Sequence, residues 1–267
     1  MAKQTGVLRY SGNLGGISHY KMKGVSGDLA KIANGPSKEQ IMKDPAFKRT
    51  RENNIEFGAS AKTAKNLRVG LASVIKNFSD PQVAGRITKV FKAINIEGVG
   101  ARGKRRIDLS LHREMLDGFE FDKTISFGSV FNAQFSITEN AARNESTLEI
   151  LPFNPMDYVN APAGATHFRV LNGLAVVSDV RYNAAQKAYA VVVPTLDGLN
   201  DITYSPYLSL DAPIAANTLI TSTLPGLPTM STDVSVVNVI GIEFYQEVGG
   251  EYYLFAAGNA MQVGKVF

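Results

Sequence analysis

The spacing of apolar residues changes at Phe119, and this change limits the chain to folds that combine helices with a sheet. Before it, in residues 46–96, apolar side chains recur every three or four positions, as in an amphipathic helix. After it, as over residues 165–170, one face alternates with the other, as in a strand. Helical and strand segments form two blocks and do not alternate, which argues against a doubly wound parallel sheet. We therefore expect an α+β fold.

Two helices are predicted in the first block. The second begins at Ser79-Asp80-Pro81, because Ser or Asp caps a helix and Pro suits its first position. Each helix has one apolar stripe, so the pair forms a helical hairpin whose stripes either meet each other or cover a sheet. The stripe residues are Ala64, Leu67, Leu71, Val74, Ile75 and Phe78 in the first helix, and Val83, Ile87, Val90, Phe91 and Ile94 in the second.

Antiparallel strands are predicted from Phe119 to the last residue. Gly249-Gly250 is a strong hairpin signal, because glycine adopts the positive φ that a two-residue turn requires. A second hairpin is expected around residues 183–186, and a further strand over 260–267. About eight strands with Gly and Pro in their connections favour an antiparallel β-sandwich, jelly-roll or immunoglobulin-like in layout.

Residues 1–45 contain too many glycines for a long helix. Strand-like pieces at 6–10 and 17–22 lie between these glycines, and Ser37 with Gln40 forms a capping-box pattern that predicts a short helix. Such a segment has too little apolar content to fold alone, so it needs the rest of the chain or a neighbouring subunit. The predicted organisation is an extended basic arm over 1–45, a helical hairpin with a basic loop over 46–118, and a β-sandwich over 119–267.

Charge is divided along the chain. Residues 1–106 hold 21 of the 28 Lys and Arg residues and 7 of the 24 Asp and Glu residues, whereas residues 107–267 carry a net charge of −10. Opposite ends can attract other copies head to tail, and the basic part can bind an anionic polymer such as nucleic acid. The alternative is that the charges only follow element type, since helices are richer in Lys and Arg than strands.

Composition excludes several classes of site. Cysteine is absent, which rules out disulfides, thiolate zinc sites, iron–sulfur clusters and cysteine nucleophiles. No run approaches about 18 apolar residues, so no transmembrane helix is predicted. The first residues lack the apolar segment of a secretory signal, which predicts cytoplasmic synthesis, with residence in a virion or other particle, or release by lysis or a dedicated route.

A glycine-rich basic loop over 98–106 matches two phosphate-binding patterns without their context. Such a turn follows a strand and opens a helix, whereas this loop follows a helix, and Arg105 stands where a P-loop needs Ser or Thr. A flexible surface loop and a phosphate-backbone contact remain as interpretations. The cations predicted for anion or nucleic-acid contact are Arg102, Lys104, Arg105 and Arg106 in the loop, with Lys62, Lys65 and Arg68 on the first helix.

Catalytic and metal-binding patterns are incomplete. The stretch around Ser26 is one residue short of a hydrolase nucleophile elbow. Glu120 and Asp122 share a strand face, but alternate acids on an exposed strand are usually solvated. We therefore predict no enzymatic activity, no metal site and no cofactor. The three histidines are far apart in sequence and none has a second ligand at zinc spacing: His19, His112 and His167.

One motif carries a resemblance. The stretch Asp44-Pro-Ala-Phe-Lys-Arg-Thr-Arg-Glu-Asn53 forms a DPAFxRTREN motif. With other stretches along nearly the whole chain, it resembles an uncharacterised family of Bacteroidota or bacteriophage-associated proteins. The resemblance implies a bacterial or bacteriophage source and one unit of arm, helices and sandwich, and it implies no enzymatic activity. The other stretches are 15–21, 56–58, 101–103, 164–168 and 241–248.

These features predict a structural, self-assembling subunit of a filament, shell or virion-like particle. A terminal segment would add to an exposed sheet edge of a neighbour through main-chain hydrogen bonds. The alternatives are a nucleic-acid-binding or packaging protein that uses the basic first half, and a β-sandwich that binds carbohydrate or protein through loops at one end. The residues predicted for subunit contact are Tyr10, Ile17, Tyr20, Met22, Val263 and Phe267.

Overall fold

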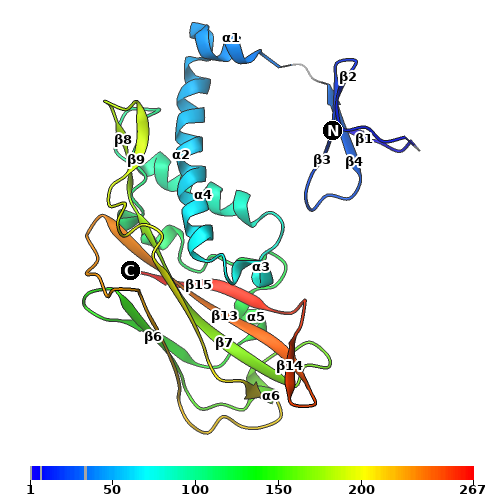
Figure 1. Ribbon diagram of the computed structural model, residues 1–267, viewed down its shortest axis with the longest axis vertical. Coiled ribbons are helices and arrows are strands. Elements are labelled where there is room, and N and C mark those ends of the chain that lie inside the picture. Colours follow the sequence, from blue (N-terminus) through cyan, green and yellow to red (C-terminus); the bar gives the residue numbers. More distant parts are fainter. Residues whose placement is uncertain (1, 7, 33–34) are drawn as a thin grey trace. The chain divides into compact units, whose positions relative to one another are not determined.

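The computed structural model describes residues 2–6, 8–32 and 35–267. These residues form a mixed α+β fold with antiparallel sheets, as the sequence predicts (Figure 1). The chain divides into two compact units, 1–55 and 56–267. The three hydrophobic clusters found in the described residues all lie in the second unit, so that unit has a core of its own.

The first unit contains a small antiparallel sheet in the order β1-β4-β3-β2. A turn at Gly15 and Gly16 joins β2 to β3, and both glycines adopt the left-handed φ that it requires, 56° and 78°. The strand predicted over 17–22 is confirmed as β3. The described residues of the piece predicted over 6–10 form no strand, and Val7 lies outside the described residues. The strands are β1 (Ala2–Lys3), β2 (Gly12–Leu14), β3 (Ile17–Lys21) and β4 (Asp28–Ile32).

A short helix, α1 (Lys38–Lys43), comes next in the sequence with the predicted capping box. Ser37 Oγ accepts a hydrogen bond from the Gln40 amide at 3.1 Å, and Gln40 Oε1 accepts one from the Ser37 amide at 2.7 Å. After the single turn η1 (Pro45–Phe47), helix α2 (Lys48–Gly70) begins in the first unit and continues in the second.

The two helices predicted over 46–96 are α2 and α4 (Val83–Glu97). The first helix ends earlier than predicted: α2 ends at Gly70, and the last four residues of its predicted stripe lie in the following turn and in the single turn α3 (Ile75–Phe78). Both predicted stripes are largely buried. Helix α4 begins shortly after Asp80, whose Oδ1 accepts a hydrogen bond from the Gln82 amide at 2.6 Å. Among the described helices, none is both long enough and apolar enough to cross a membrane.

A central antiparallel sheet forms the middle of the second unit. Its two long strands, β7 and β13, pair with each other, and its order is β10-β7-β13-β14, with β11 also on β7 and β15 also on β13. A second sheet has the order β12-β6-β5, and β8 and β9 form a separate hairpin. The bounds are β5 (Phe135–Glu139), β6 (Glu145–Ile150), β7 (His167–Ser178), β8 (Val180–Asn183), β9 (Ala188–Val191), β10 (Asn200–Tyr204), β11 (Leu208–Ser209), β12 (Thr218–Thr223), β13 (Val234–Val248), β14 (Glu251–Leu254) and β15 (Ala260–Val266), with the short helices η2 (Leu109–Leu111), η3 (Arg113–Met115), α5 (Phe127–Val130) and α6 (Pro155–Tyr158).

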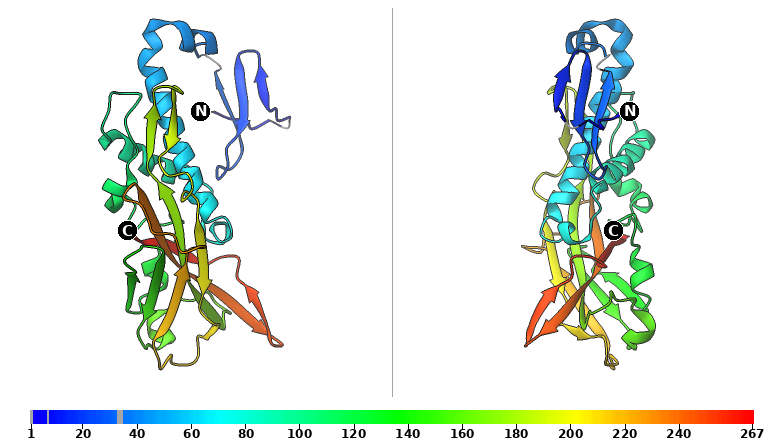
Figure 2. Two further views of the ribbon diagram at one scale, coloured as in Figure 1. Left: turned by 60° about the vertical axis from the view of Figure 1, so that its left-hand side comes forward. Right: turned by 90° about the vertical axis from the view of Figure 1, so that its right-hand side faces the viewer.

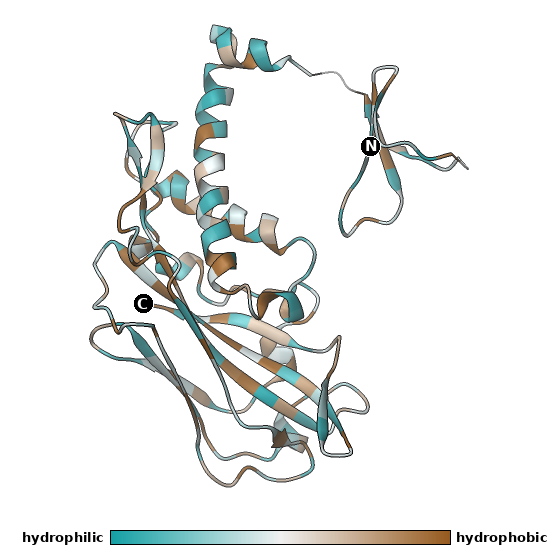
Figure 3. Cartoon of the chain, in the orientation of Figure 1, coloured by the Kyte–Doolittle hydropathy of each residue, from teal (hydrophilic) through white to brown (hydrophobic). Residues whose placement is uncertain are grey.

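The long strands of the central sheet are buried on both faces over most of their length. Leu171 and Ala175 of β7 pack in one cluster with the apolar stripes of α2 and α4. Phe168 and Val170, on the opposite face, pack in a second cluster with residues of β6 and β12. The helical stripes therefore cover a sheet, and the apolar strands β7 and β13 lie between the helices and the smaller sheet (Figures 2 and 3).

Both predicted hairpins are confirmed. Val248 pairs with Glu251 across Gly249 and Gly250, which adopt φ values of 63° and 88°. Strand β8 pairs with β9 around the second predicted turn. The predicted last strand is β15, which pairs with β13.

Candidate assembly and anion-contact surfaces

The small sheet of the first unit carries an apolar row that no other described element of that unit covers. Leu14 of β2 lies opposite Ile17 of β3, which lies opposite Ile32 of β4. Residues opposite one another across strands share a face, so the three side chains form one row. They are 60%, 41% and 69% exposed, respectively. We call these three residues the apolar row.

The first unit has almost no interior to hide such a row. Among its described residues, Leu29 is the only buried apolar side chain. A shallow hollow of about 420 Å³ lies on the sheet, with Ile17 and Ile32 in its lining. A small sheet gains stability by packing one face against another element. Within the first unit the apolar row has no such cover.

Basic side chains surround this sheet. Residues 2–32 hold five Lys and Arg residues and one acid, Asp28. Asp28 is buried and pairs with Arg9 at 3.2 Å and Lys21 at 3.5 Å. The first unit therefore presents an apolar row within a positively charged segment.

In the second unit, the basic loop is fastened to α2 by a buried carboxylate. Glu56 is fully buried, and its two oxygens accept hydrogen bonds from Arg105 Nε and Nη2 at 2.9 and 2.6 Å. Lys92 Nζ and the Gly103 amide donate to the same carboxylate at 2.6 and 2.7 Å. Burial alone would raise the pKa of Glu56, but these donors together lower it to about 2. We call these four residues the Glu56 cluster.

The Glu56 cluster separates the predicted anion-contact residues of the loop into two groups. The guanidinium of Arg105 donates its hydrogen bonds to Glu56, and the Arg105 carbonyl accepts a hydrogen bond from the Tyr189 hydroxyl at 2.7 Å. Arg105 therefore has a structural role. Arg102, Lys104 and Arg106 are exposed. The loop also folds back on itself, since the Arg106 amide donates to the Val99 carbonyl at 3.1 Å. On α2, Lys62 and Lys65 are exposed and Arg68 is half-buried.

The predicted subunit-contact residues also fall into two groups, one in the first unit and one in the core of the second. Tyr10, Ile17 and Met22 are exposed on the first unit, and Tyr20 lies under the Lys31 ammonium group, 5.7 Å from its ring centre. Val263 and Phe267 instead lie in the core of the second unit, which corrects their interpretation as contact residues. Val263 faces the helices in the central sheet, and the Phe267 backbone exchanges hydrogen bonds with Val236 at 2.7 and 3.0 Å.

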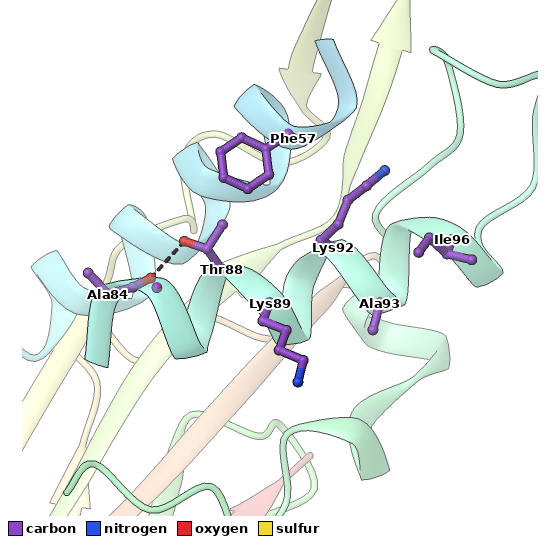
Figure 4. Close-up of a pocket in the computed structure, with 8 residues that line it drawn as sticks. Phe57, Ala84, Thr88, Lys89, Lys92, Ala93 and Ile96 are labelled. Carbon is purple, nitrogen blue, oxygen red and sulfur yellow. Dashed lines mark hydrogen bonds between the residues drawn. The ribbon is translucent and has the colours of Figure 1, made fainter. Parts of the chain in front are cut away.

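A shallow apolar groove lies between α2 and α4 (Figure 4). Its volume is about 540 Å³, and Phe57 of α2 and Ile96 of α4 leave about half of their surface exposed in it. The sequence analysis missed this groove. Phe57 lies seven residues before Ala64 and so continues the apolar stripe of its helix, and this large apolar residue beyond the predicted stripe was the available signal. The remaining lining residues are Ala84, Gly85, Thr88, Lys89, Lys92 and Ala93.

The structure assembles no metal-binding group from the residues it describes: none of their His, Asp and Glu side chains gather in sets of three or more that could hold an ion. The Glu120 carboxylate accepts a hydrogen bond from the Phe127 amide at 3.1 Å, and Asp122 accepts one from the Thr124 amide at 2.7 Å, so both acids order local turns. No protein-family model, curated protein or solved structure matches the chain.

Proposed function

We propose that this chain is a structural subunit that self-assembles through its first unit into a filament, shell or virion-like particle. The observation that carries the proposal is the apolar row of Leu14, Ile17 and Ile32 on a sheet with almost no interior. Exposed apolar surface that is grouped in this way is typical of an interaction site. The opposite charges of the two parts of the chain supply attraction between copies.

The row by itself supports only a weak contact. Complete burial of an aliphatic side chain contributes about 1.5–3 kcal/mol, and the three residues are already partly covered. Their total of a few kcal/mol is comparable to the entropic cost of joining two molecules. A stable assembly therefore needs more than the row, either paired backbone edges or charge complementarity.

The test is light scattering after size-exclusion chromatography, on the full chain and on the double variant Ile17→Asp/Ile32→Asp. The wild type is expected to run as a multimer of the 28.8 kDa chain, and the variant as a monomer. A matched control is Leu111→Asp/Met156→Asp, which charges two side chains of the second unit that are 70% and 71% exposed. A monomeric wild type, or a variant that assembles like the control, would reject the proposal.

A second candidate function is binding of a nucleic acid. Arg102, Lys104 and Arg106 are exposed on one ordered loop, and neutralisation of phosphates by such cations makes affinity fall steeply with salt. The corresponding test is binding of labelled DNA or RNA by the wild type and by the triple alanine variant of these residues. A smaller salt dependence for the triple variant supports this candidate, and an unchanged dependence excludes this loop as the contact.

A further inference from the structure

The central sheet of the second unit has an open edge at β14. Among the described strands, β14 pairs with β13 alone, and all four of its residues are exposed. The hairpin of β13 and β14 projects beyond β15 (Figures 1 and 2). An open strand edge presents unpaired main-chain groups that another strand can bind.

The hydrogen-bond pattern shows which main-chain groups are open. The Phe255 amide donates to the Phe244 carbonyl at 2.9 Å, so the main-chain groups of Phe255 point toward β13. Because inward and outward residues alternate along an antiparallel strand, the amides and carbonyls of Tyr252 and Leu254 point away from β13. These two residues provide the sites for an added strand.

Aromatic contacts hold this edge in place. The ring of Tyr252 stacks on that of Tyr207, with centres 3.8 Å apart and planes inclined by 6°. The Arg169 guanidinium lies 4.8 Å from the centre of the Tyr207 ring, and His167 meets Tyr252 edge-on at 5.0 Å. A strand that is already ordered loses little conformational entropy when it binds a partner.

The charge of this edge selects the partner. Residues 246–254 contain the acids Glu247 and Glu251 and no basic residue, whereas residues 2–32 carry five basic residues and one acid. Two such acidic edges repel each other, as do two basic sheets, so each surface disfavours its own copy and favours the other. The exposed side chains of Tyr253 and Leu254 supply apolar area on the two faces of this edge, Tyr253 on the face of Glu251 and Leu254 on the face of Glu247.

The sheet of the first unit has an open edge to match. Strand β2 pairs with β3 alone among the described strands. Leu14 and Ile17 flank a two-residue turn and form the main-chain hydrogen-bonded pair that closes it. The main-chain groups of the preceding residue, Asn13, therefore point away from β3. The apolar row begins on this same edge strand, at Leu14.

We propose that β2 in one copy of the chain adds to the β14 edge of a second copy. This inference rests on the proposed function and specifies its interface. Backbone hydrogen bonds through Asn13 join the two edges in antiparallel pairing with Tyr252 or Leu254. This register places the apolar row on the face of Tyr253, which it contacts, and the lysines of the first unit face the acids Glu247 and Glu251. Because the two surfaces differ, the contact is heterologous and generates an open filament or a ring.

The test uses two variants that each lose one surface. Leu254→Pro removes an outward amide that β13 does not use, and proline is tolerated at such an edge position. Its control, Leu254→Ala, keeps that amide. We expect Leu254→Pro to be monomeric and Leu254→Ala to assemble.

Mixing the variants tests whether the two surfaces bind each other. Ile17→Asp/Ile32→Asp keeps the β14 edge, and Leu254→Pro keeps the first unit. Each is expected to be a monomer alone, and an equimolar mixture is expected to give a one-to-one dimer, identified by a mass tag on one variant. If the wild type assembles, two results would overturn the proposed interface. One is assembly of Leu254→Pro alone, and the other is an equimolar mixture in which both variants remain monomers. A monomeric wild type would instead reject the proposed function itself, and the interface with it.

Discussion

Replacement of Glu56 by Gln tests the role of the Glu56 cluster. The amide keeps the shape of the side chain but removes the charge, so the Arg105 and Lys92 side chains, which are about four-fifths buried, lose their anion. The wild-type carboxyl has a pKa of about 2 against an ordinary value of 4.5, and each unit of pKa corresponds to about 1.4 kcal/mol. The charge therefore stabilises the fold by roughly 3 kcal/mol, close to the ~3–5 kcal/mol lost when a buried ion pair is broken.

The dependence on pH has a definite sign. Because the pKa of Glu56 is lower in the folded state, its contribution is complete above pH 4.5 and is lost as the pH falls from 4.5 to about 2. The free energy of unfolding of Glu56→Gln should thus lie roughly 3 kcal/mol below that of the wild type at pH 7, and the difference should narrow over this acidic range.

The assay is urea unfolding followed by circular dichroism, since the chain has no tryptophan. Both chains carry Ile17→Asp/Ile32→Asp, so that assembly does not contribute. The control is Glu52→Gln on the same helix, which removes a pair with Arg49, whose side chain is 68% exposed, and should cost less than about 1 kcal/mol. A loss at Glu56→Gln no larger than that of the control, or a difference that is constant with pH, would refute the reasoning.

Two further predictions use the same unfolding assay. Gly173→Ala would bring a methyl group within 2.5 Å of the Ile202 side chain and should destabilise the fold by about 1–3 kcal/mol. Gly58→Ala, in the interior of α2, meets nothing within 4 Å and should stabilise the fold by about 0.5–1 kcal/mol. The reverse order of stability would contradict the packing of these two glycines. Asp80→Ala leaves a partly buried arginine without its carboxylate and should cost about 3–5 kcal/mol. Asp122→Ala removes only hydrogen bonds to Thr124 within one turn and should cost less than about 1 kcal/mol, and equal losses would show that the buried pair is unimportant.

Local signals in the sequence predicted most elements of the fold. The period of the apolar residues identified α2 and α4, and Gly249-Gly250 identified the β13–β14 turn, because each signal depends only on neighbouring residues. The stretch 174–177 is apolar without alternation, which is typical of a strand buried on both faces. What such signals do not specify is which layers cover those faces, because that depends on contacts between distant parts of the chain.

The candidate sites depended more on distant contacts. Arg105 and Arg106 are equivalent in sequence, yet only Arg105 reaches Glu56, which lies 49 residues earlier. Val263 and Phe267 lie in a terminal strand that the sequence analysis treated as available to a neighbour, whereas β13 of the same chain already pairs with that strand. The sequence analysis predicted a strand from Ile17 but not the turn before it, and the apolar row became clear only once the register of β2, β3 and β4 was known.

Light scattering on the untagged full chain, at low and high salt and at two absorbance wavelengths, tests self-assembly most directly. The proposed function predicts a multimer of the 28.8 kDa chain at low salt that loses mass as salt screens the attraction between the basic first unit and the acidic β14 edge. The absorbance ratio shows whether nucleic acid is present in that multimer. A 28.8 kDa monomer at every salt concentration would contradict the account.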